Sequence, residues 1–304
     1  MTPTPDATAR FDLEDDGACA TIDPRAGGAI AAYATRIAGR RVEWIAAPPA
    51  GSRDAGAVGC FPLVPYSNRI RDGRFPFADR IVALPTDPAS DPHFEHGHGW
   101  REPWRVVDRG TRHALLQFRH EADAWPWPYE AMQAIALEAG DLVVELAVVN
   151  CGHAPMPVGL GLHPFFTRTP GMRLRAAVAG MWRTDAAVLP TALGPVPPDA
   201  DLTAGATIDA LDLDNVFTGW DGHAVLERPA EGARLTISAT PPLRFLVVYA
   251  PPGQPYFCAE PVSNATDAFN LSAAGRDDTG LIVLAPGERA VATVRMSPGA
   301  LAAP

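Results

Sequence analysis

One stretch of the sequence decides the class of fold: Met132-Gln133-Ala134-Ile135-Ala136-Leu137-Glu138-Ala139-Gly140-Asp141-Leu142-Val143-Val144-Glu145-Leu146-Ala147-Val148-Val149. Two short extended runs, 132–137 and 142–149, flank a turn-like Ala-Gly-Asp segment, a pattern typical of a β-hairpin. The second run is the most apolar of the chain, but Glu145 interrupts it and it is too short to span a bilayer. The stretch therefore predicts two paired strands.

The same pattern of short extended runs between turn signals continues along the chain, with very little helical periodicity. Further strands are expected at Ala18–Ile22, Ala29–Arg36, Val42–Ala46, Leu115–Phe118, Arg234–Ala239, Leu243–Tyr249, Leu281–Leu284 and Ala290–Met296. The first three of these form an opening meander. The turn Pro286-Gly287-Glu288 is expected to close a final hairpin. The Pro/Ala/Asp-rich residues 184–206 are expected to form a long surface excursion.

Many short strands and few helices predict an all-β fold, a large antiparallel β-sandwich whose two sheets enclose the core. The 32 prolines fit this loop-rich fold and would be hard to place in a helical bundle. The 304 residues, 47% of them hydrophobic, are enough for one large domain or for two smaller ones. Because residues 184–206 are interpreted as an excursion within one domain, residues 1–304 are expected to form a single domain.

Charge and cysteine content exclude several classes of partner. The formal net charge is −10 and no Lys/Arg-rich block interrupts it, so nucleic acid and anionic membranes are poor partners. The four widely spaced cysteines (Cys19, Cys60, Cys151 and Cys258) are expected to be free core thiols in a reducing compartment. The acidic, proline-containing first twenty residues show no signal peptide, so a soluble, cytoplasmic protein is expected.

Three of the eight histidines lie within six positions, in Pro92-His93-Phe94-Glu95-His96-Gly97-His98-Gly99-Trp100-Arg101-Glu102-Pro103-Trp104. Imidazoles offer donors and acceptors, and the glycines allow sharp turns or close approach of a ligand. A binding or catalytic loop and a surface turn anchored by a buried Trp both fit this pattern. The three imidazoles could converge on a metal ion, but no HExxH pattern or facing Cys pair accompanies them, so no metal site is predicted.

Three further motifs carry candidate chemistry. In Pro65–Phe75, the Arg69 fork beside the Asn68 amide suits a polyhydroxylated ligand, although a salt-bridged hairpin turn would look similar. His163 stands among aromatic residues, where a buried core histidine is the default interpretation. Glu260 ends an apolar run, and burial would raise its pKa toward that of a general base working near neutral pH. Both residues precede a proline, which restricts them to extended backbone.

Taken together, these motifs resemble the aldose 1-epimerases, or galactose mutarotase-like proteins, over most of the chain. The segments that carry the resemblance, in their order along the chain, are Asn68-Arg69 with Gly73 and Phe75, His96-Gly97, His163-Pro164-Phe165-Phe166, Asp214-Asn215 before Val216-Phe217, and Glu260-Pro261. The resemblance implies a galactose mutarotase-like supersandwich. It also implies aldose 1-epimerase (mutarotase) activity, in which the α and β anomers of a free aldose interconvert by acid–base-catalysed ring opening.

The resemblance also implies a role for each site residue. Glu260 would be the general base at the anomeric hydroxyl and His163 the general acid at the ring oxygen, with His96 assisting there or binding the sugar. Arg69 and Asp214 would hydrogen-bond the sugar hydroxyls. Asn68 and Trp100 are further candidates for sugar binding, the latter by stacking on the apolar face of a pyranose, as Trp104 also could. The partner would be a small monosaccharide, and the chemistry would need no metal or cofactor.

Some positions depart from the family pattern and leave alternatives open. The family commonly has a second glycine after the His-Gly pair, where this chain has His98, which with His93 is expected to support the site or tune its specificity. Asp212 competes with Asp214 as the sugar ligand. The additional arginines Arg71, Arg74 and Arg101 would suit a hexose-6-phosphate 1-epimerase, although solvated surface arginines would look the same. A non-catalytic sugar-binding protein on the same fold is a further alternative.

Overall fold

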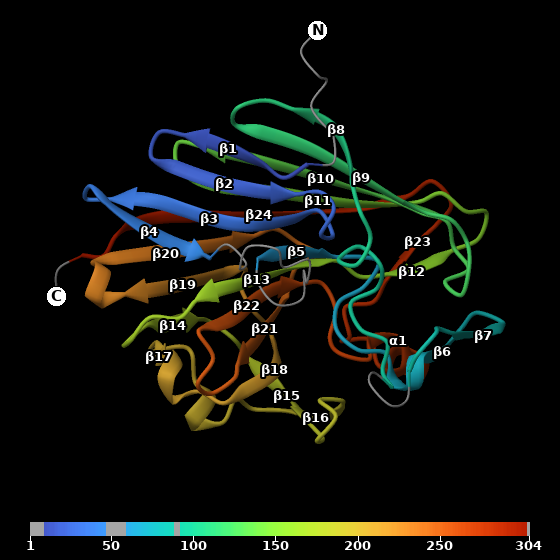
Figure 1. The fold of residues 1–304 in the computed structure, drawn as a ribbon. Coiled ribbons are helices and arrows are strands. Elements are labelled where there is room, and N and C mark those ends of the chain that lie inside the picture. Colours follow the sequence, from blue (N-terminus) through green and yellow to red (C-terminus); the bar gives the residue numbers. More distant parts are fainter. Residues whose placement is uncertain (1–8, 47–58, 88–91, 303–304) are drawn as a thin grey trace, which may run out of the picture.

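The computed structural model describes residues 9–46, 59–87 and 92–302, and these form two large antiparallel β-sheets. Residues 1–8, part of the segment in which no signal peptide is expected, lie outside the described residues. Figure 1 shows the two sheets lying one across the other at the upper side of the molecule, where β1 (Phe11–Asp15), β2 (Ala18–Asp23) and β3 (Ala29–Ile37) cover β10 (Tyr129–Glu138) and β24 (Arg289–Ala300). The predicted all-β sandwich is confirmed.

The eleven-stranded sheet carries the central strands of the molecule. In spatial order its strands are β1, β2, β3, β5 (Cys60–Leu63), β13 (Gly161–Thr167), β22 (Tyr256–Val262), β21 (Phe245–Ala250), β18 (Leu213–Thr218), β15 (Gly180–Thr184) and β16 (Pro190–Gly194), with β4 (Arg40–Ile45) paired to β3. The nine-stranded sheet runs through β17 (Ala206–Thr207), β14 (Arg173–Ala176), β19 (His223–Arg228), β20 (Ala233–Ala239), β24, β11 (Asp141–Asn150), β10, β9 (His113–His120) and β8 (Arg105–Arg109).

The remaining elements are short. Two ribbons pair β6 (Arg74–Phe77) with β7 (Arg80–Ala83) and β12 (Met156–Val158) with β23 (Ile282–Leu284). Helical turns are confined to α1 (Ala268–Ala273), η1 (Arg71–Gly73), η2 (Pro198–Ala200), η3 (Ile208–Ala210) and η4 (Pro229–Glu231) within the described ranges. In this part of the chain no helix has the length and apolar character needed to cross a membrane.

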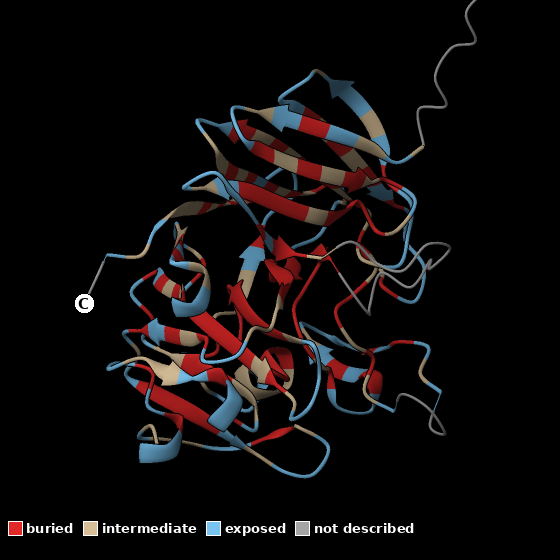
Figure 2. Cartoon of the chain, turned by 60° about the vertical axis from the view of Figure 1, so that its left-hand side comes forward, coloured by how far each residue is buried: buried red, intermediate tan, exposed pale blue. Residues whose placement is uncertain are grey.

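The predicted hairpin at 132–149 is confirmed as β10 and β11. Leu137 pairs with Leu142 across the turn, in which Ala139 and Gly140 have positive φ angles of 51° and 89°. Along β10 every second residue is buried, because successive side chains of a strand point to opposite faces. One face of this hairpin therefore packs in the core between the sheets, and the other is partly exposed (Figure 2).

The central strands β5, β13, β22 and β21 are buried on both faces, and Figure 2 shows them as nearly continuous red ribbons. In β13, Leu162 and Phe166 pack in the large core between the sheets, whereas Phe165 belongs to a second, smaller cluster on the opposite face. In β22 the same alternation places Phe257 in the core and Cys258 in the second cluster. The side chains of His163 and Phe165 thus share the face that turns away from the core.

Three details of the sequence prediction were wrong. The turn at 286–288 does not close a hairpin, because β23 pairs with β12 while β24 lies between β11 and β20. Residues 184–206 are not only a surface excursion: they include β16, which pairs with β15, and they bury Leu202 in the core. All four cysteines are free, but Cys151 is exposed and Cys19 only partly buried, so neither is a core thiol. Strand patterns alone do not reveal which non-neighbouring strands pair.

The turn before β3 supports residues 92–104, called the histidine loop below, through two glycines. Gly27 and Gly28 have φ angles of 66° and 64°, which favour glycine. A Cβ on Gly27 would lie 2.1 Å from the carbonyl oxygen of Trp100, and one on Gly28 would lie 2.8 Å from the ring of Trp104. The backbone nitrogen of Trp104 also donates to the carbonyl of Pro24 at 2.8 Å. The histidine loop therefore packs against a backbone turn in which a side chain at Gly27 or Gly28 would clash with it.

We expect Gly27→Ala to lower the free energy of unfolding by about 2–4 kcal/mol, the sum of left-handed backbone strain and overpacking against Trp100. Gly39→Ala is the matched control, because Gly39 has a φ of 81° but no atom within 4 Å of the added Cβ. This control should cost only about 1–2 kcal/mol. Urea unfolding measures both values, and equal losses would show that the contact with Trp100 carries no strain.

Candidate active site

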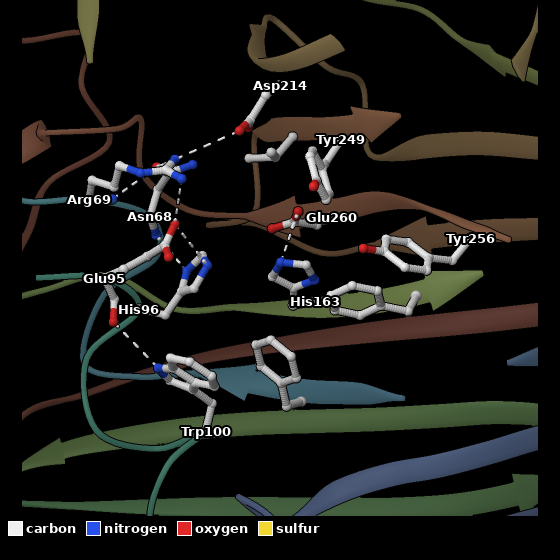
Figure 3. Close-up of a pocket in the computed structure, with 13 residues that line it drawn as sticks. Asn68, Arg69, Glu95, His96, Trp100, His163, Asp214, Tyr249, Tyr256 and Glu260 are labelled. Carbon is white, nitrogen blue, oxygen red and sulfur yellow. Dashed lines mark hydrogen bonds and ion pairs between the residues drawn. The ribbon is translucent and has the colours of Figure 1, made fainter. Parts of the chain in front are cut away.

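A pocket of about 230 Å³ lies on the outer face of the central strands. Its floor follows two adjacent rows across the sheet, since paired residues of neighbouring strands point to the same side. His163 pairs with Phe61 of β5 in one row, and Phe165 pairs with Cys258 of β22 in the other. The lining residues are Phe61, Asn68, Arg69, Glu95, His96, Trp100, His163, Phe165, Asp214, Val247, Tyr249, Tyr256 and Glu260. Figure 3 shows their polar groups pointing into one space.

His163 and Glu260 meet at the floor of this pocket. His163 Nε2 lies 3.3 Å from Glu260 Oε1, and the two residues are only 6% and 2% exposed (Figure 3). Burial, followed by the charges of Asp214 and Glu95, raises the pKa of Glu260 well above its ordinary value. Burial also lowers the pKa of His163 well below its ordinary value. The sequence predicted two stiffly held groups, and the fold places them in contact.

The segments around Asn68 and His96 interlock beside this pair. The backbone nitrogen of His96 donates to the carbonyl of Asn68 at 3.0 Å, and the backbone nitrogen of Asn68 donates to His96 Nδ1 at 2.9 Å. Both residues have left-handed backbone, with φ angles of 64° and 60°. Such backbone costs of the order of 1–3 kcal/mol in a residue other than glycine and persists only where the surroundings impose it. Gly97 is required because a Cβ there would lie 2.5 Å from Pro65.

This interlock fixes the protonation state of His96. Because Nδ1 accepts a backbone N–H, the neutral imidazole carries its proton on Nε2. Burial, reinforced by the charges of Arg69 and Arg101, lowers the pKa of His96 to about 3. His96 is therefore uncharged at neutral pH and presents an N–H donor, 3.6 Å from Glu95 Oε1.

Arg69 forms the polar wall of the pocket together with two carboxylates. Its Nη2 atom lies 3.1 Å from Glu95 Oε1, and its Nη1 atom lies 3.9 Å from Asp214 Oδ2 (Figure 3). Its backbone nitrogen donates to the Asn68 side-chain oxygen at 2.9 Å. Burial raises the pKa of Asp214 even though Arg69 opposes the shift. Asn68 is only 4% exposed, so its amide chiefly braces Arg69.

A second part of the lining is aromatic. Trp100 stacks on Phe61 with ring centroids 5.4 Å apart, and Phe165 stacks on His163 at 4.6 Å. Trp104 does not reach the pocket: it is 1% exposed and its Nε1 donates to the carbonyl of Gly99 at 2.7 Å. Trp104 is therefore the buried anchor of the loop, and Trp100 supplies the face open to a ligand.

All seven residues proposed for the site from the sequence line this pocket: Glu260, His163, His96, Arg69, Asp214, Asn68 and Trp100. Asp212, the competing candidate, is exposed outside it. Two of the histidines predicted to support the site lie elsewhere. His93 accepts the backbone N–H of Asp72, and His98 stacks on His120 and contacts the hydroxyl of Tyr129.

Sequence reasoning missed several lining residues, of which the polar ones are Glu95, Tyr249 and Tyr256. The signal for Glu95 was its place next to His96 in the histidine loop. Tyr249 could have been found only with the strand register, because it reaches the pocket by pairing with Asp214 on β18 and with Cys258 on β22. The arginines considered for phosphate binding, Arg71, Arg74 and Arg101, do not line the pocket.

Two groups of side chains bring three potential metal ligands within 4.8 Å of one another in the described part of the chain. In the group of His98, His120 and Asp123, the two imidazole planes are only 8° apart, so their lone pairs do not converge on one point. In the group of His163, Cys258 and Glu260, burial raises the pKa of the Cys258 thiol, and a protonated thiol is a poor ligand. Neither donor set fits a metal ion well.

Comparison with known proteins gives consistent matches over nearly the whole chain. A family model described as aldose 1-epimerase matches residues 10–297. The uncharacterized Escherichia coli K12 protein YphB is 33% identical over 237 residues, which are 75% of this chain and 80% of that protein. A solved structure from Escherichia coli K12, named provisionally as an aldose 1-epimerase, is 28% identical with a TM-score of 0.86 over 96% of this chain and 99% of its own. A galactose mutarotase-like protein from Clostridium acetobutylicum shares the fold at 20% identity, with a TM-score of 0.85 over 96% and 94% of the two chains.

We expect Glu260→Gln to stabilise the protein increasingly as pH rises. The pKa of Glu260 is higher in the folded than in the unfolded state, so its favourable contribution is complete below the ordinary value of 4.5 and is lost as pH rises through the raised value. Glutamine keeps the shape and never ionises. Urea unfolding at about pH 5 and about pH 8 measures the gap between variant and wild type. The exposed Glu102→Gln is the control, and a gap that does not change with pH would contradict the expectation.

Proposed function

The chain belongs to the aldose 1-epimerase family, and from this premise we propose that it interconverts the α and β anomers of a free aldose by acid–base-catalysed ring opening. The observation that carries the proposal is the 3.3 Å contact between His163 Nε2 and Glu260 Oε1 at the floor of the pocket. Ring opening needs one proton removed from the anomeric hydroxyl and another delivered to the ring oxygen, two oxygens bonded to the same carbon. An adjacent carboxylate and imidazole supply these two functions together.

The pair holds one mobile proton near neutral pH. It exists either as a protonated carboxyl beside a neutral imidazole or as a carboxylate beside an imidazolium. Burial favours the uncharged arrangement, in agreement with the raised pKa of Glu260 and the lowered pKa of His163. A single proton transfer from Glu260 to His163 converts the uncharged arrangement into the reactive charged one.

The proposed reaction uses the charged form. The Glu260 carboxylate takes the proton of the anomeric hydroxyl, the C1–O electron pair forms the carbonyl, and the bond from C1 to the ring oxygen breaks. The ring oxygen takes the proton of the His163 imidazolium. Rotation about C1–C2 and the reverse transfers then close the ring as the other anomer. Every step is a proton transfer, a bond rotation, or the making or breaking of one C–O bond, so the scheme uses no cofactor.

The other lining residues bind and orient the sugar in this scheme. The Nε2–H of His96, uncharged and fixed by Asn68, donates to the ring oxygen or to a neighbouring hydroxyl. Arg69 and Asp214 hydrogen-bond hydroxyl groups at the far wall, and Trp100 covers the apolar face of the ring. The pocket volume of about 230 Å³ lies below the ~300–1,000 Å³ that is usual for drug-sized ligands. A single monosaccharide is therefore the substrate size that we propose.

Polarimetry of freshly dissolved α-D-glucose and α-D-galactose tests this function. We expect catalytic amounts of the protein to speed the change in optical rotation, and we expect Glu260→Gln to lower kcat by about 10²–10⁴-fold with little change in sugar affinity, because only the proton acceptor is removed. Glu102→Gln, an exposed change outside the pocket, should leave the rate unaltered. Calorimetric sugar binding with no acceleration for any common aldose would instead indicate a non-catalytic sugar-binding protein.

The catalysed rate should form a broad plateau across neutral pH. Acid inactivation requires a second proton on the pair, which the lowered pKa of His163 moves to lower pH. Alkaline inactivation requires loss of the shared proton, which the raised pKa of Glu260 moves to higher pH. NMR of the anomeric protons between about pH 5 and about pH 9, corrected for buffer catalysis, gives the profile. A narrow bell between the ordinary values of 4.5 and 6.5 would contradict the assignment.

A further inference from the structure

The pocket lining has more acidic than basic side chains. Among the lining residues, three carry carboxyl groups (Glu95, Asp214 and Glu260) and one, Arg69, carries a permanent positive charge. Burial raises the pKa of Glu260, which favours its uncharged form. The lining then still has one cation, Arg69, against the two carboxyl groups of Glu95 and Asp214. Sequence reasoning assigned no function to Glu95.

Arg69 already faces two carboxylates across the pocket. Its two terminal nitrogens face Glu95 at 3.1 Å and Asp214 at 3.9 Å, one carboxylate on each side. The side chains of Glu95 and Asp214 remain 27% and 31% exposed, more than the 23% of Arg69. Part of each carboxyl-bearing side chain is therefore open to a ligand, as is part of Arg69.

Three other arginines do not line the pocket. Arg71 Nε lies 3.5 Å from Asp267 Oδ2, and the guanidinium of Arg101 lies 4.7 Å above the ring of Trp100, where its charge helps to lower the pKa of His96. Arg74 is an exposed residue of β6. A phosphate group is normally held by several convergent cations or backbone N–H groups. The described pocket lining offers only Arg69, which already faces two carboxylates.

We propose, building on the proposed function, that Glu95 makes this pocket selective for uncharged aldoses and excludes anionic sugars such as uronates and sugar phosphates. A phosphate or carboxylate on the substrate would have to displace Glu95 from Arg69 or lie close to it in a pocket that is partly shielded from water, where like charges repel strongly. Neutral hydroxyls instead donate to the Glu95 and Asp214 oxygens while Arg69 donates to hydroxyl oxygens. Glu95 is thus a specificity-determining residue, which sets the substrate class as free aldoses rather than their 6-phosphates.

The charge of Glu95 acts on both Glu260 and Asp214. The pKa of Glu260 is raised mainly by burial, then by the charge of Asp214, and also by the charge of Glu95. The pKa of Asp214 is likewise raised mainly by burial and also by the charge of Glu95. Glu95 Oε1 also lies 3.6 Å from His96 Nε2, at the side where the sugar ring oxygen is proposed to bind. An anionic substituent anywhere on the ring would therefore lie within the field of this carboxylate.

The experiment compares four sugars of one stereochemistry but different charge: glucose, glucosamine, glucuronate and glucose 6-phosphate. For wild type, kcat/KM for anomer exchange followed by NMR should be at least about tenfold lower for the two anions than for glucose, with glucosamine accepted. Glu95→Gln should raise the anion-to-glucose ratio by about tenfold or more, because it removes one negative charge and frees Arg69. Glu102→Gln, in the same loop but outside the pocket, should leave the ratio unchanged.

Calorimetric affinities for the same four sugars separate this proposal from the proposed function. If no sugar is turned over but the affinity ratios follow the expected order and respond to Glu95→Gln, the epimerase proposal fails and the role of Glu95 stands. If turnover is found but Glu95→Gln changes all four sugars by the same factor, Glu95 only braces Arg69 and the selectivity proposal is overturned. A wild type that prefers glucose 6-phosphate to glucose would also overturn it.

Discussion

The structure depends on a pair of adjacent strands, β13 and β22, that are buried on both faces yet carry an imidazole and a carboxylate side by side. Alternation along each strand sends Leu162 and Phe257 into the core between the sheets, and this fixes the opposite face for His163 and Glu260. A shift of either strand by one residue would exchange core and site side chains. The register that stabilises the core is therefore the same register that assembles the site.

The second constraint is the interlock between the Asn68 segment and the histidine loop. Each segment contains a left-handed residue other than glycine, and each uses the other's backbone to satisfy its hydrogen bonds. Two contacts keep the loop in this strained conformation: Gly97 packs against Pro65, and Trp104 donates a hydrogen bond to the carbonyl of Gly99. This arrangement holds His96 in a single tautomer. It keeps the imidazole an uncharged hydrogen-bond donor, whereas an unconstrained histidine would titrate near neutral pH.

The class of fold was predictable from the sequence because the strand period is local, as the 132–149 hairpin illustrates. Long-range pairing was not predictable: the turn at 286–288 joins two strands that pair with distant partners, and nothing within the turn encodes them. The candidate site residues could be proposed from the sequence because they belong to short motifs, and all seven line one pocket. Tyr249 was missed because it enters through cross-strand register alone. That residues 1–304 form a single domain stays a prediction.

The histidine loop shows why composition is a weaker guide than register. Its three imidazoles look equivalent in the sequence, but the fold gives them three environments. His93 lies at the Asp72 turn, His96 faces the pocket, and His98 lies against His120. Glu95, which lies between His93 and His96, lines the pocket and adds a carboxylate to it through its ion pair with Arg69. A polar wall in which carboxylates outnumber cations recognises hydroxyl groups by accepting hydrogen bonds from them, and the same oxygens disfavour any substrate that brings a negative charge of its own.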